Sequence, residues 1–166
     1  MVDKNLQAEL LPYPLPPWQH RFRTLAVFCE VDEAALARRV PKPLELSSNI
    51  VQVTVMHFES TVPHRPYYDS AVIAQVKHGN SVGGNWIYGF TSTDQVLSHT
   101  REVWGYNMKL ADMSIVEHPD RIEARCLRLG ETIISLNVNP NNQTFEAEDM
   151  YMYPRIFLKG IPDANH

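Results

Sequence analysis

The chain has 166 residues, of which 44% are hydrophobic and 20% are charged, a balance typical of one globular domain with an apolar core. Its net charge is −4, and its basic residues are scattered, as at Arg38, Arg39 and Lys42, which excludes a nucleic-acid-binding stripe. No apolar run approaches the roughly 18–20 residues of a membrane span, and no basic region precedes an apolar core at the N-terminus. We therefore expect a cytoplasmic protein with neither a membrane nor a nucleic-acid partner.

The proline content predicts irregular, strand-rich structure, since twelve prolines stand against seven glycines. Four prolines fall within residues 1–20, and because proline fixes φ and lacks an N–H donor, we predict an extended arm there. Residues 21–166 contain no repeat or linker and are predicted to form one domain. Cys29 and Cys126, the only cysteines, lie in apolar runs and are expected to be buried free thiols, as in a reducing compartment.

In the first half of the domain, the residue pattern predicts strands joined by one short helix. Residues 25–31 are apolar and predict a strand, after which Asp32 is placed to cap a helix over residues 33–39 that Pro41 ends. Residues 50–58 are rich in valine and predict a second strand. Because both faces of this strand are largely apolar, we expect it to be covered on both sides.

In the second half of the domain, the residue pattern predicts one helix and several strands. The helix covers residues 94–104, where Val96, Leu97 and Val103 have helical spacing. The predicted class is α+β, rich in strands, arranged as a meander with short helices. The strands are predicted over residues 71–77, 85–90, 113–117, 121–127, 132–138 and 155–161.

Three segments of the chain carry recognisable motifs. Residues 31–46 read Val-Asp-Glu-Ala-Ala-Leu-Ala-Arg-Arg-Val-Pro-Lys-Pro-Leu-Glu-Leu, and residues 154–162 read Pro-Arg-Ile-Phe-Leu-Lys-Gly-Ile-Pro. Between them, residues 100–110 read Thr-Arg-Glu-Val-Trp-Gly-Tyr-Asn-Met-Lys-Leu. In this order the segments resemble the acetoacetate decarboxylase family, in which Gly-Arg-Glu leads into Tyr-Pro-Lys-Lys-Leu.

The resemblance implies a cone-shaped, largely antiparallel β-barrel with short helices that encloses a dry pocket. Family chains usually continue past the point where this one ends, so the barrel is expected to be incomplete in this chain. An incomplete barrel exposes strand edges, which proteins normally avoid. We therefore expect a homo-oligomer or a second chain that completes the barrel. No metal or cofactor is expected, because the family relies on protein groups alone.

In this family the first lysine of the Lys-Lys pair forms a Schiff base with the keto substrate, and this position falls on Met108. A lysine attacks a ketone only as the neutral amine, which requires a lowered pKa, and the family's own lysine is a standard example of this effect. A thioether cannot form an imine. The resemblance thus implies a divergent member that lacks the Schiff-base lysine.

The adjacent lysine of the pair is retained as Lys109. Neighbouring residues of an extended segment point to opposite sides, so Lys109 is expected to face away if Met108 faces the pocket. A shift of one residue would instead bring Lys109 into the cavity. A Schiff-base decarboxylase that uses Lys109 therefore stays open as an alternative.

The family's other functional positions are only partly retained. Of two pocket carboxylates, one falls on Asp69 and the other on Thr54, while the pocket arginine falls on Phe22. Asp69 is the candidate general acid or base, because an apolar cavity would raise its pKa, and a capping role in a loop is the alternative. Arg101 and Glu102 of the Arg-Glu motif are intact, either as catalytic groups or as an internal ion pair that shapes the following turn.

Four further side chains are candidates for the substrate pocket, namely Tyr67, Trp104, Tyr106 and Met108. They suit a pocket for a large apolar ligand, in which methionine forms an adaptable wall, although an ordinary core would use the same residue types.

The leading hypothesis is a lyase-type enzyme that acts on a β-keto or polyketide-like carbonyl substrate by acid–base catalysis, without a Schiff base. Because relatives of this fold include aldolase-dehydratase and cyclase activities of secondary metabolism, the reaction is decarboxylation, dehydration or cyclisation. The alternative from another class is a non-catalytic subunit of the same fold that binds a small molecule or has a structural role.

Overall fold

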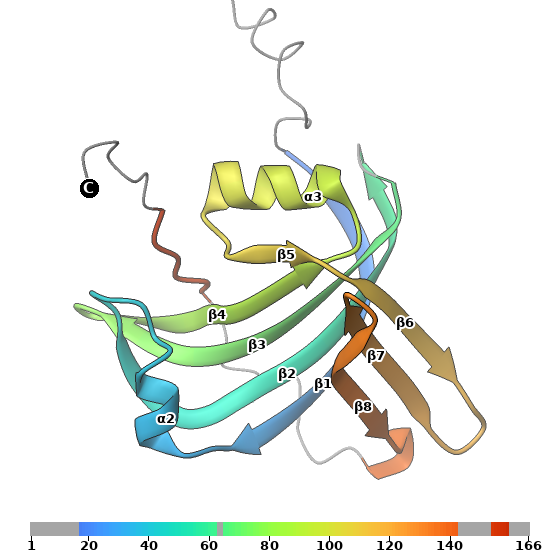
Figure 1. The fold of residues 1–166 in the computed structure, drawn as a ribbon, viewed down its shortest axis with the longest axis horizontal. Coiled ribbons are helices and arrows are strands. Elements are labelled where there is room, and N and C mark those ends of the chain that lie inside the picture. The colour runs from blue at the N-terminus through green and yellow to red at the C-terminus, as the bar shows by residue number, and fades with distance from the viewer. Residues whose placement is uncertain (1–16, 63–64, 143–153, 160–166) are drawn as a thin grey trace, which may run out of the picture.

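The computed structural model describes residues 17–62, 65–142 and 154–159, which form two β-sheets and short helices (Figure 1). The strands are β1 (Gln19–Glu30), β2 (Glu45–Val62), β3 (Tyr67–His78), β4 (Ser81–Thr91), β5 (Met108–Leu110), β6 (Asp112–Glu117), β7 (Ile122–Arg128) and β8 (Glu131–Val138). The larger sheet has the order β1-β2-β3-β4-β5 and the smaller sheet the order β6-β7-β8. All neighbouring strands are antiparallel except β4 and β5, which run parallel. Within the described residues neither sheet closes into a barrel, and the predicted β-rich class is confirmed.

The two faces of β2 are both covered, as its apolar pattern predicts. On one face Val55 packs with Phe90 and with residues of the smaller sheet, namely Ala124, Cys126, Ile134 and Leu136. On the other face Met56 packs with Trp86 and Met108. Because apolar side chains of β2 point to both faces, this strand contributes to an apolar cluster on each side of the sheet.

The helices are short. Helix α2 (Glu33–Ala37) begins where the sequence predicts, because the Asp32 side chain accepts a hydrogen bond of 2.6 Å from the Ala35 N–H. Helix α3 (Asp94–His99) continues directly into a π-helix, η1 (Thr100–Trp104), so the single helix predicted here has two hydrogen-bonding patterns. Gly105 ends this unit with a φ of 76°, a conformation that glycine adopts without strain. A 3₁₀ turn, η2 (Pro140–Asn142), follows β8.

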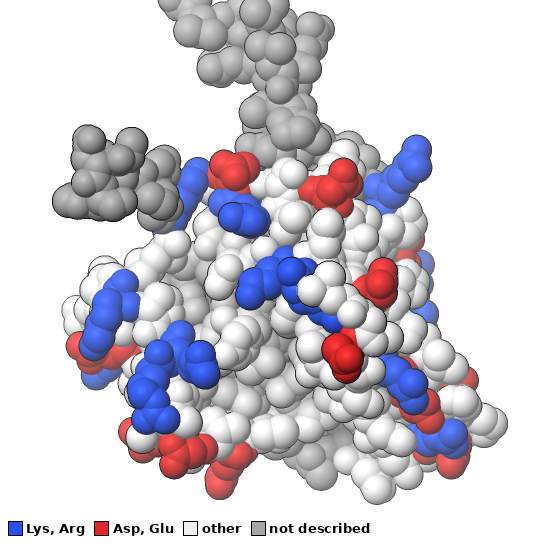
Figure 2. All heavy atoms as spheres, in the orientation of Figure 1, with Lys and Arg blue, Asp and Glu red and all other residues white. Residues whose placement is uncertain are grey.

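The surface carries charges of both signs. Figure 2 shows acidic and basic side chains interspersed on the viewed face, without a patch of one sign. Arg23 of β1 forms ion pairs with Glu59 of β2 and Glu117 of β6 and so joins the two sheets at their surface. In the part of the chain that the structure describes, every helix is too short or too polar to cross a membrane.

Four expectations differ from the structure or lie outside it. Strand β1 begins earlier than predicted, since it is an edge strand whose first residues are exposed and give no apolar signal. For the same reason Cys29, near the end of this edge strand, is exposed rather than buried, whereas Cys126 is buried as expected. In residues 155–161, only Arg155 makes a bridge, to Gly84 of β4, and residues 156–159 are not a strand. Residues 160–161 and residues 1–16 of the predicted arm lie outside the described residues.

Candidate active site

One face of the larger sheet collects most of the candidate residues. Directly paired residues of β2 and β3 point to the same side, and because side chains alternate along each strand, every second pair lies on the same face. This side lies opposite the face that packs on the smaller sheet. We call it the site face, and its central members are Gln52, Thr54, Met56, Phe58, Tyr67, Asp69, Ala71 and Ile73.

Met108 lies on the site face and is 1% exposed. Strand β5 brings it there by pairing Met108 with Gly89 of β4, which in turn pairs with Ala71 of β3. A Cβ atom on residue 89 would lie 2.5 Å from the Met108 sulfur, so glycine is the residue that leaves room for this side chain. Met108, the position that the resemblance assigns to the family's lysine, therefore places a thioether inside the apolar cluster.

Asp69 carries the carboxyl group among the central members of the site face, and it is 5% exposed. It pairs with Met56 on one side and with Thr91 on the other. Burial raises the pKa of Asp69 to about 7, and a hydrogen bond with the Thr91 side chain opposes this effect in part. The Asp69 Oδ1 atom has no hydrogen-bond partner among the described residues. Asp69 is thus a strand residue with a carboxyl group suited to proton transfer near neutral pH, rather than a loop cap.

Tyr67 lies two residues from Asp69 on the same face. Burial raises the pKa of Tyr67 above its ordinary value, and the nearby Asp69 and Tyr106 raise it further. The phenol is therefore neutral and can donate a hydrogen bond. Its ring stacks on Phe58 at 4.4 Å, and Phe58 stacks on Phe22 at 4.9 Å, so Phe22 forms the outer end of an aromatic stack and is 47% exposed.

Thr54 is buried between β1 and β3. Its hydroxyl donates a hydrogen bond of 3.0 Å to the Leu25 carbonyl oxygen of β1. Its backbone carbonyl accepts a hydrogen bond of 2.8 Å from the Ser70 hydroxyl of β3. Since its one hydroxyl proton is already used, Thr54 shapes the site face rather than acting as a donor.

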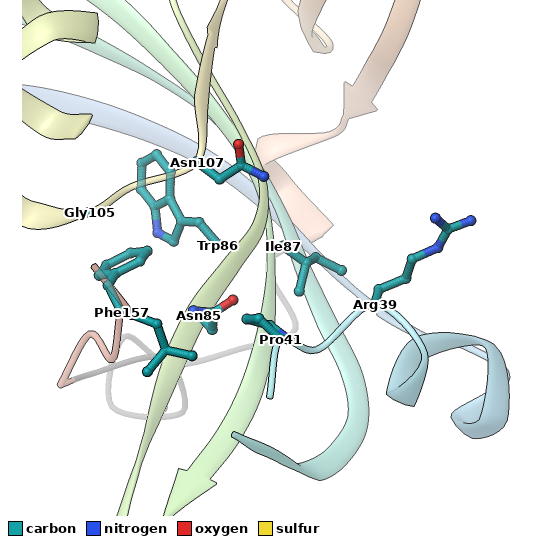
Figure 3. Close-up of a pocket in the computed structure, with 9 residues that line it drawn as sticks. Arg39, Pro41, Asn85, Trp86, Ile87, Gly105, Asn107 and Phe157 are labelled. Carbon is teal, nitrogen blue, oxygen red and sulfur yellow. The ribbon is translucent and has the colours of Figure 1, made fainter. Parts of the chain in front are cut away.

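Three aromatic rings form a wall beside Met108. Trp86 contacts Tyr106 edge to face at 4.9 Å, and Tyr106 stacks on Phe157 at 3.7 Å. A cleft of about 180 Å³ opens next to this wall (Figure 3). It is lined by Arg39, Pro41, Asn85, Trp86, Ile87, Gly105, Asn107, Phe157 and Leu158. Trp86 belongs to both the cleft and the buried cluster, so the cleft borders the site face.

The π-helix places the Arg-Glu motif away from this face. Arg101 and Glu102 are both exposed, and no ion pair joins them in the described part of the chain. Consecutive helical residues point in different directions, which explains why the predicted pair does not form. Their backbones shape the turn instead, because the Arg101 carbonyl accepts from the Gly105 N–H and the Glu102 carbonyl accepts from the Lys159 ammonium.

Two further candidates lie at the surface. Lys109 is exposed, on the opposite side of β5 from Met108, as the alternation of an extended segment predicts. Trp104 is 49% exposed and makes an edge contact with Trp18 at 6.0 Å. The structure thus brings Thr54, Asp69, Tyr67, Tyr106 and Met108 together, and places Lys109, Arg101, Glu102 and Trp104 elsewhere.

Sequence reasoning missed two polar residues of the site face. Gln52 is 2% exposed and Trp86 is 7% exposed, and both have a side-chain atom without a partner among the described residues, Oε1 and Nε1 respectively. The alternation of residues 50–58 already places Gln52 on the same face as Thr54, and a buried glutamine there is an available signal. Nothing in the sequence distinguishes Trp86 from a core residue.

The chain is similar in sequence to known proteins of one family. A family model described as acetoacetate decarboxylase (ADC) matches residues 2–166. An acetoacetate decarboxylase of Burkholderia mallei is 23% identical over 111 residues, which are 66% of this chain and 45% of that protein. The chain therefore spans about half the length of the curated relatives it matches.

Solved structures show the same fold. The crystal structure of acetoacetate decarboxylase from Legionella pneumophila superposes with a TM-score of 0.83 at 22% identity, over 94% of this chain and 64% of that chain. The enduracididine biosynthesis enzyme MppR, with HEPES buffer bound, superposes with a TM-score of 0.80 at 12% identity, over 96% of this chain and 68% of that chain. The motifs, the strand order and the family model converge, and the chain belongs to the acetoacetate decarboxylase family.

Proposed function

We propose that this chain acts as an acetoacetate-decarboxylase-like lyase on a β-keto or related carbonyl substrate, by acid–base catalysis at Asp69 and without a Schiff base. The observation that carries the proposal is the buried Asp69 carboxyl group, which has one unpartnered oxygen and a pKa of about 7. It shares the site face with Met108, which occupies the position of the family's nucleophile.

Asp69 can replace the electron sink that the imine supplies in the family. In its protonated form it donates its proton to the keto oxygen of a β-keto carboxylate as the bond to the carboxylate carbon breaks. The bonding electrons form the carbon–carbon double bond of an enol, and CO₂ leaves. The enol carbon then takes a proton from water, the hydroxide that remains is neutralised by a proton from solvent, and the enol oxygen returns its proton to Asp69. The net reaction converts a β-keto carboxylate and one proton into a ketone and CO₂.

The surrounding residues support this chemistry. The apolar cluster around Met56, Ala71 and Met108 lowers the local dielectric constant, which strengthens a hydrogen bond from Asp69 to a carbonyl oxygen. The neutral Tyr67 phenol, whose own pKa is raised in part by the nearby Asp69, is a second donor for the developing negative charge. Met108 provides a flexible apolar wall against the hydrocarbon part of the substrate.

The proposal is tested by decarboxylation assays with acetoacetate and longer β-keto acids. We expect Asp69→Asn to lower kcat by about 100-fold or more, the range typical of a lost general acid. Asp112→Asn, at an exposed position on β6, is the matched control and should keep full activity. Borohydride added with the substrate should leave no adduct. Unchanged turnover in Asp69→Asn, or a trapped adduct on Lys109, would contradict the proposal.

A second candidate function is that of a non-catalytic binding or structural subunit of the same fold. The packing of the Met108 sulfur against Gly89 favours it, because this side chain fills space directly over the sheet. A ligand or a second chain that stays bound in native mass spectra, together with no turnover of any β-keto acid, would support this function over the enzymatic one. A measured turnover that depends on Asp69 would reject it.

A further inference from the structure

Three buried polar atoms on the site face have no hydrogen-bond partner among the described residues. They are Asp69 Oδ1, Gln52 Oε1 and Trp86 Nε1. A buried polar atom left without a partner destabilises the folded chain, so such atoms point to a group that the protein binds. Asp69 is the proposed acid, whereas Gln52 and Trp86 have no part in the chemistry described above.

The strand register places Gln52 and Trp86 together at the other end of the site face from Asp69. Both pair with Ile73 of β3, Gln52 from β2 and Trp86 from β4, so they flank Ile73 on the same face. Asp69 lies four residues from Ile73 along β3, which corresponds to roughly 13 Å at the rise of a strand. Between the two ends lie Ala71 and, above Gly89, the Met108 side chain.

We propose that Gln52 and Trp86 form a second polar subsite that binds a hydroxyl group at the far end of an elongated carbonyl substrate. This inference rests on the proposed function, because it places the reacting carbonyl at Asp69. The unpartnered Gln52 oxygen accepts a hydrogen bond and the unpartnered Trp86 N–H donates one. A hydroxyl group can do both at once, whereas a carboxylate cannot donate and an ammonium group cannot accept.

The region between the two polar ends suits a hydrocarbon chain. Ala71, Ile73 and Met108 belong to one apolar cluster, and the small side chain of Ala71 leaves the space that Met108 now covers. Methionine is unbranched and has several rotatable bonds, so Met108 can change rotamer and open space for a ligand. A substrate with a keto group at one end and a hydroxyl at the other therefore matches the order of groups along the site face.

The Trp86 end of the site face is also the end that borders the cleft. Strand β5 pairs with β4 only from Gly89 onward, and the bridge to Arg155 lies at Gly84, so residues 85–87 lie between these two pairings at the edge of β4. The cleft opens there, with Phe157 beside Trp86 and Arg39 on the other side (Figure 3). We assign this cleft as the route by which the hydroxylated end of the ligand reaches Gln52.

The test compares two non-reactive ketones, 2-octanone and 8-hydroxy-2-octanone, by isothermal titration calorimetry with the full chain. We expect the hydroxylated ketone to bind the wild-type chain about fivefold more tightly or better, the size of one or two net hydrogen bonds. Gln52→Leu, which keeps the volume and removes the acceptor, should abolish this preference and leave the affinity for 2-octanone unchanged. Trp86→Phe should reduce the preference as well.

Gln75→Leu is the matched control, because the Gln75 Oε1 atom already accepts a hydrogen bond of 2.9 Å from the Ser47 hydroxyl. It should keep the preference, and thermal melting should show that every variant is folded. Equal affinity of the two ketones for the wild-type chain, or a preference that survives in both Gln52→Leu and Trp86→Phe, overturns the subsite. If Asp69→Asn leaves turnover unchanged while Gln52→Leu still abolishes the preference, the proposed function fails and the subsite stands.

Discussion

Gly89 and Met108 face each other across the parallel pair of β4 and β5, and the Met108 sulfur occupies the place where any other residue at position 89 would carry its side chain. This contact links Met108, the position that the resemblance assigns to the family's nucleophile, to the β4 backbone directly beneath it. It also explains how a long side chain fits into a sheet whose neighbouring residues are already buried. The size of residue 108 and the absence of a side chain at residue 89 are therefore coupled.

The first prediction measures this coupling by urea unfolding. Gly89→Ala should lower the free energy of unfolding by about 1–3 kcal/mol, because the new methyl group forces Met108 to move. Met108→Ala should lower it by about 2–5 kcal/mol through the cavity it leaves. In the double variant the methyl group enters that cavity, so the combined loss should be smaller than the sum by at least about 0.5 kcal/mol. Additive losses would show that the two residues do not share the space.

The second prediction concerns restoring the amine. In Met108→Lys the new ammonium group enters an apolar cluster, so burial should lower its pKa and leave a reactive fraction of neutral amine. Borohydride with acetoacetate should then trap an adduct that peptide mapping places on residue 108. Leu110→Lys is the control, since residue 110 lies on the same strand but is exposed, and it should give no adduct. The wild-type chain, which keeps Lys109, should also give none.

The third prediction is the dependence of stability on pH. The pKa of Asp69 is raised from 3.8 to about 7, so between these values the folded chain holds a proton that the unfolded chain has released. The free energy of unfolding therefore falls as pH rises through this window, by a few kcal/mol, and levels off on either side. Asp69→Asn should remove this part of the slope in urea titrations at a series of pH values. An unchanged slope would mean that Asp69 ionises in the folded chain as freely as in the unfolded one.

The ionisation of Asp69 also predicts how enzymatic activity changes with pH. If Asp69 acts as the acid, only its protonated form is active, and kcat should fall as pH rises through about 7. Activity that instead increases across this range would assign the group as a base. The profile is best recorded on a substrate that shows measurable turnover at pH 6, with folding checked at each pH.

The fourth prediction is that the two cysteine thiols differ in their reactivity. Burial raises the pKa of the Cys126 thiol to about 11, a hydrogen bond with Ser70 lowers it in part, and Asp112 raises it slightly. Cys29 is exposed. We therefore expect one thiol per chain to react rapidly with a chromogenic disulfide at pH 8, and both to react in denaturant. Cys29→Ser should abolish the rapid phase, whereas Cys126→Ser should leave it in place.

The sequence predicts those strands and helix caps that depend on residues close together in the chain. The valine-rich pattern of residues 50–58 gives β2 and its two apolar faces, and Asp32 gives the start of α2. The resemblance to the family singles out Met108 and Asp69 as candidate site residues. Strand alternation predicts that Lys109 points away from the site face, as the structure shows. Each of these inferences depends on a side chain and its near neighbours in the chain.

Other features depend on contacts between distant segments, which single residues do not encode. Strand β5 exists because β4 offers it an edge, and its three residues carry no pattern of their own. The exposure of Cys29 follows from the position of β1 at the edge of the sheet, whereas its local sequence is apolar. The pairing of Gln52 and Trp86 across Ile73 requires the register of three strands, and it is visible only once they are assembled.

The π-helix that precedes β5 has a consequence for how this segment tolerates a change in length. A π-turn holds one residue more than an α-turn, because its backbone hydrogen bonds span five residues instead of four. Deleting one residue from Thr100–Trp104 is therefore expected to restore α-helical bonding within the segment and to leave β5 in register, with Met108 buried and Lys109 exposed. Placing an amine inside the apolar cluster thus requires a substitution at residue 108.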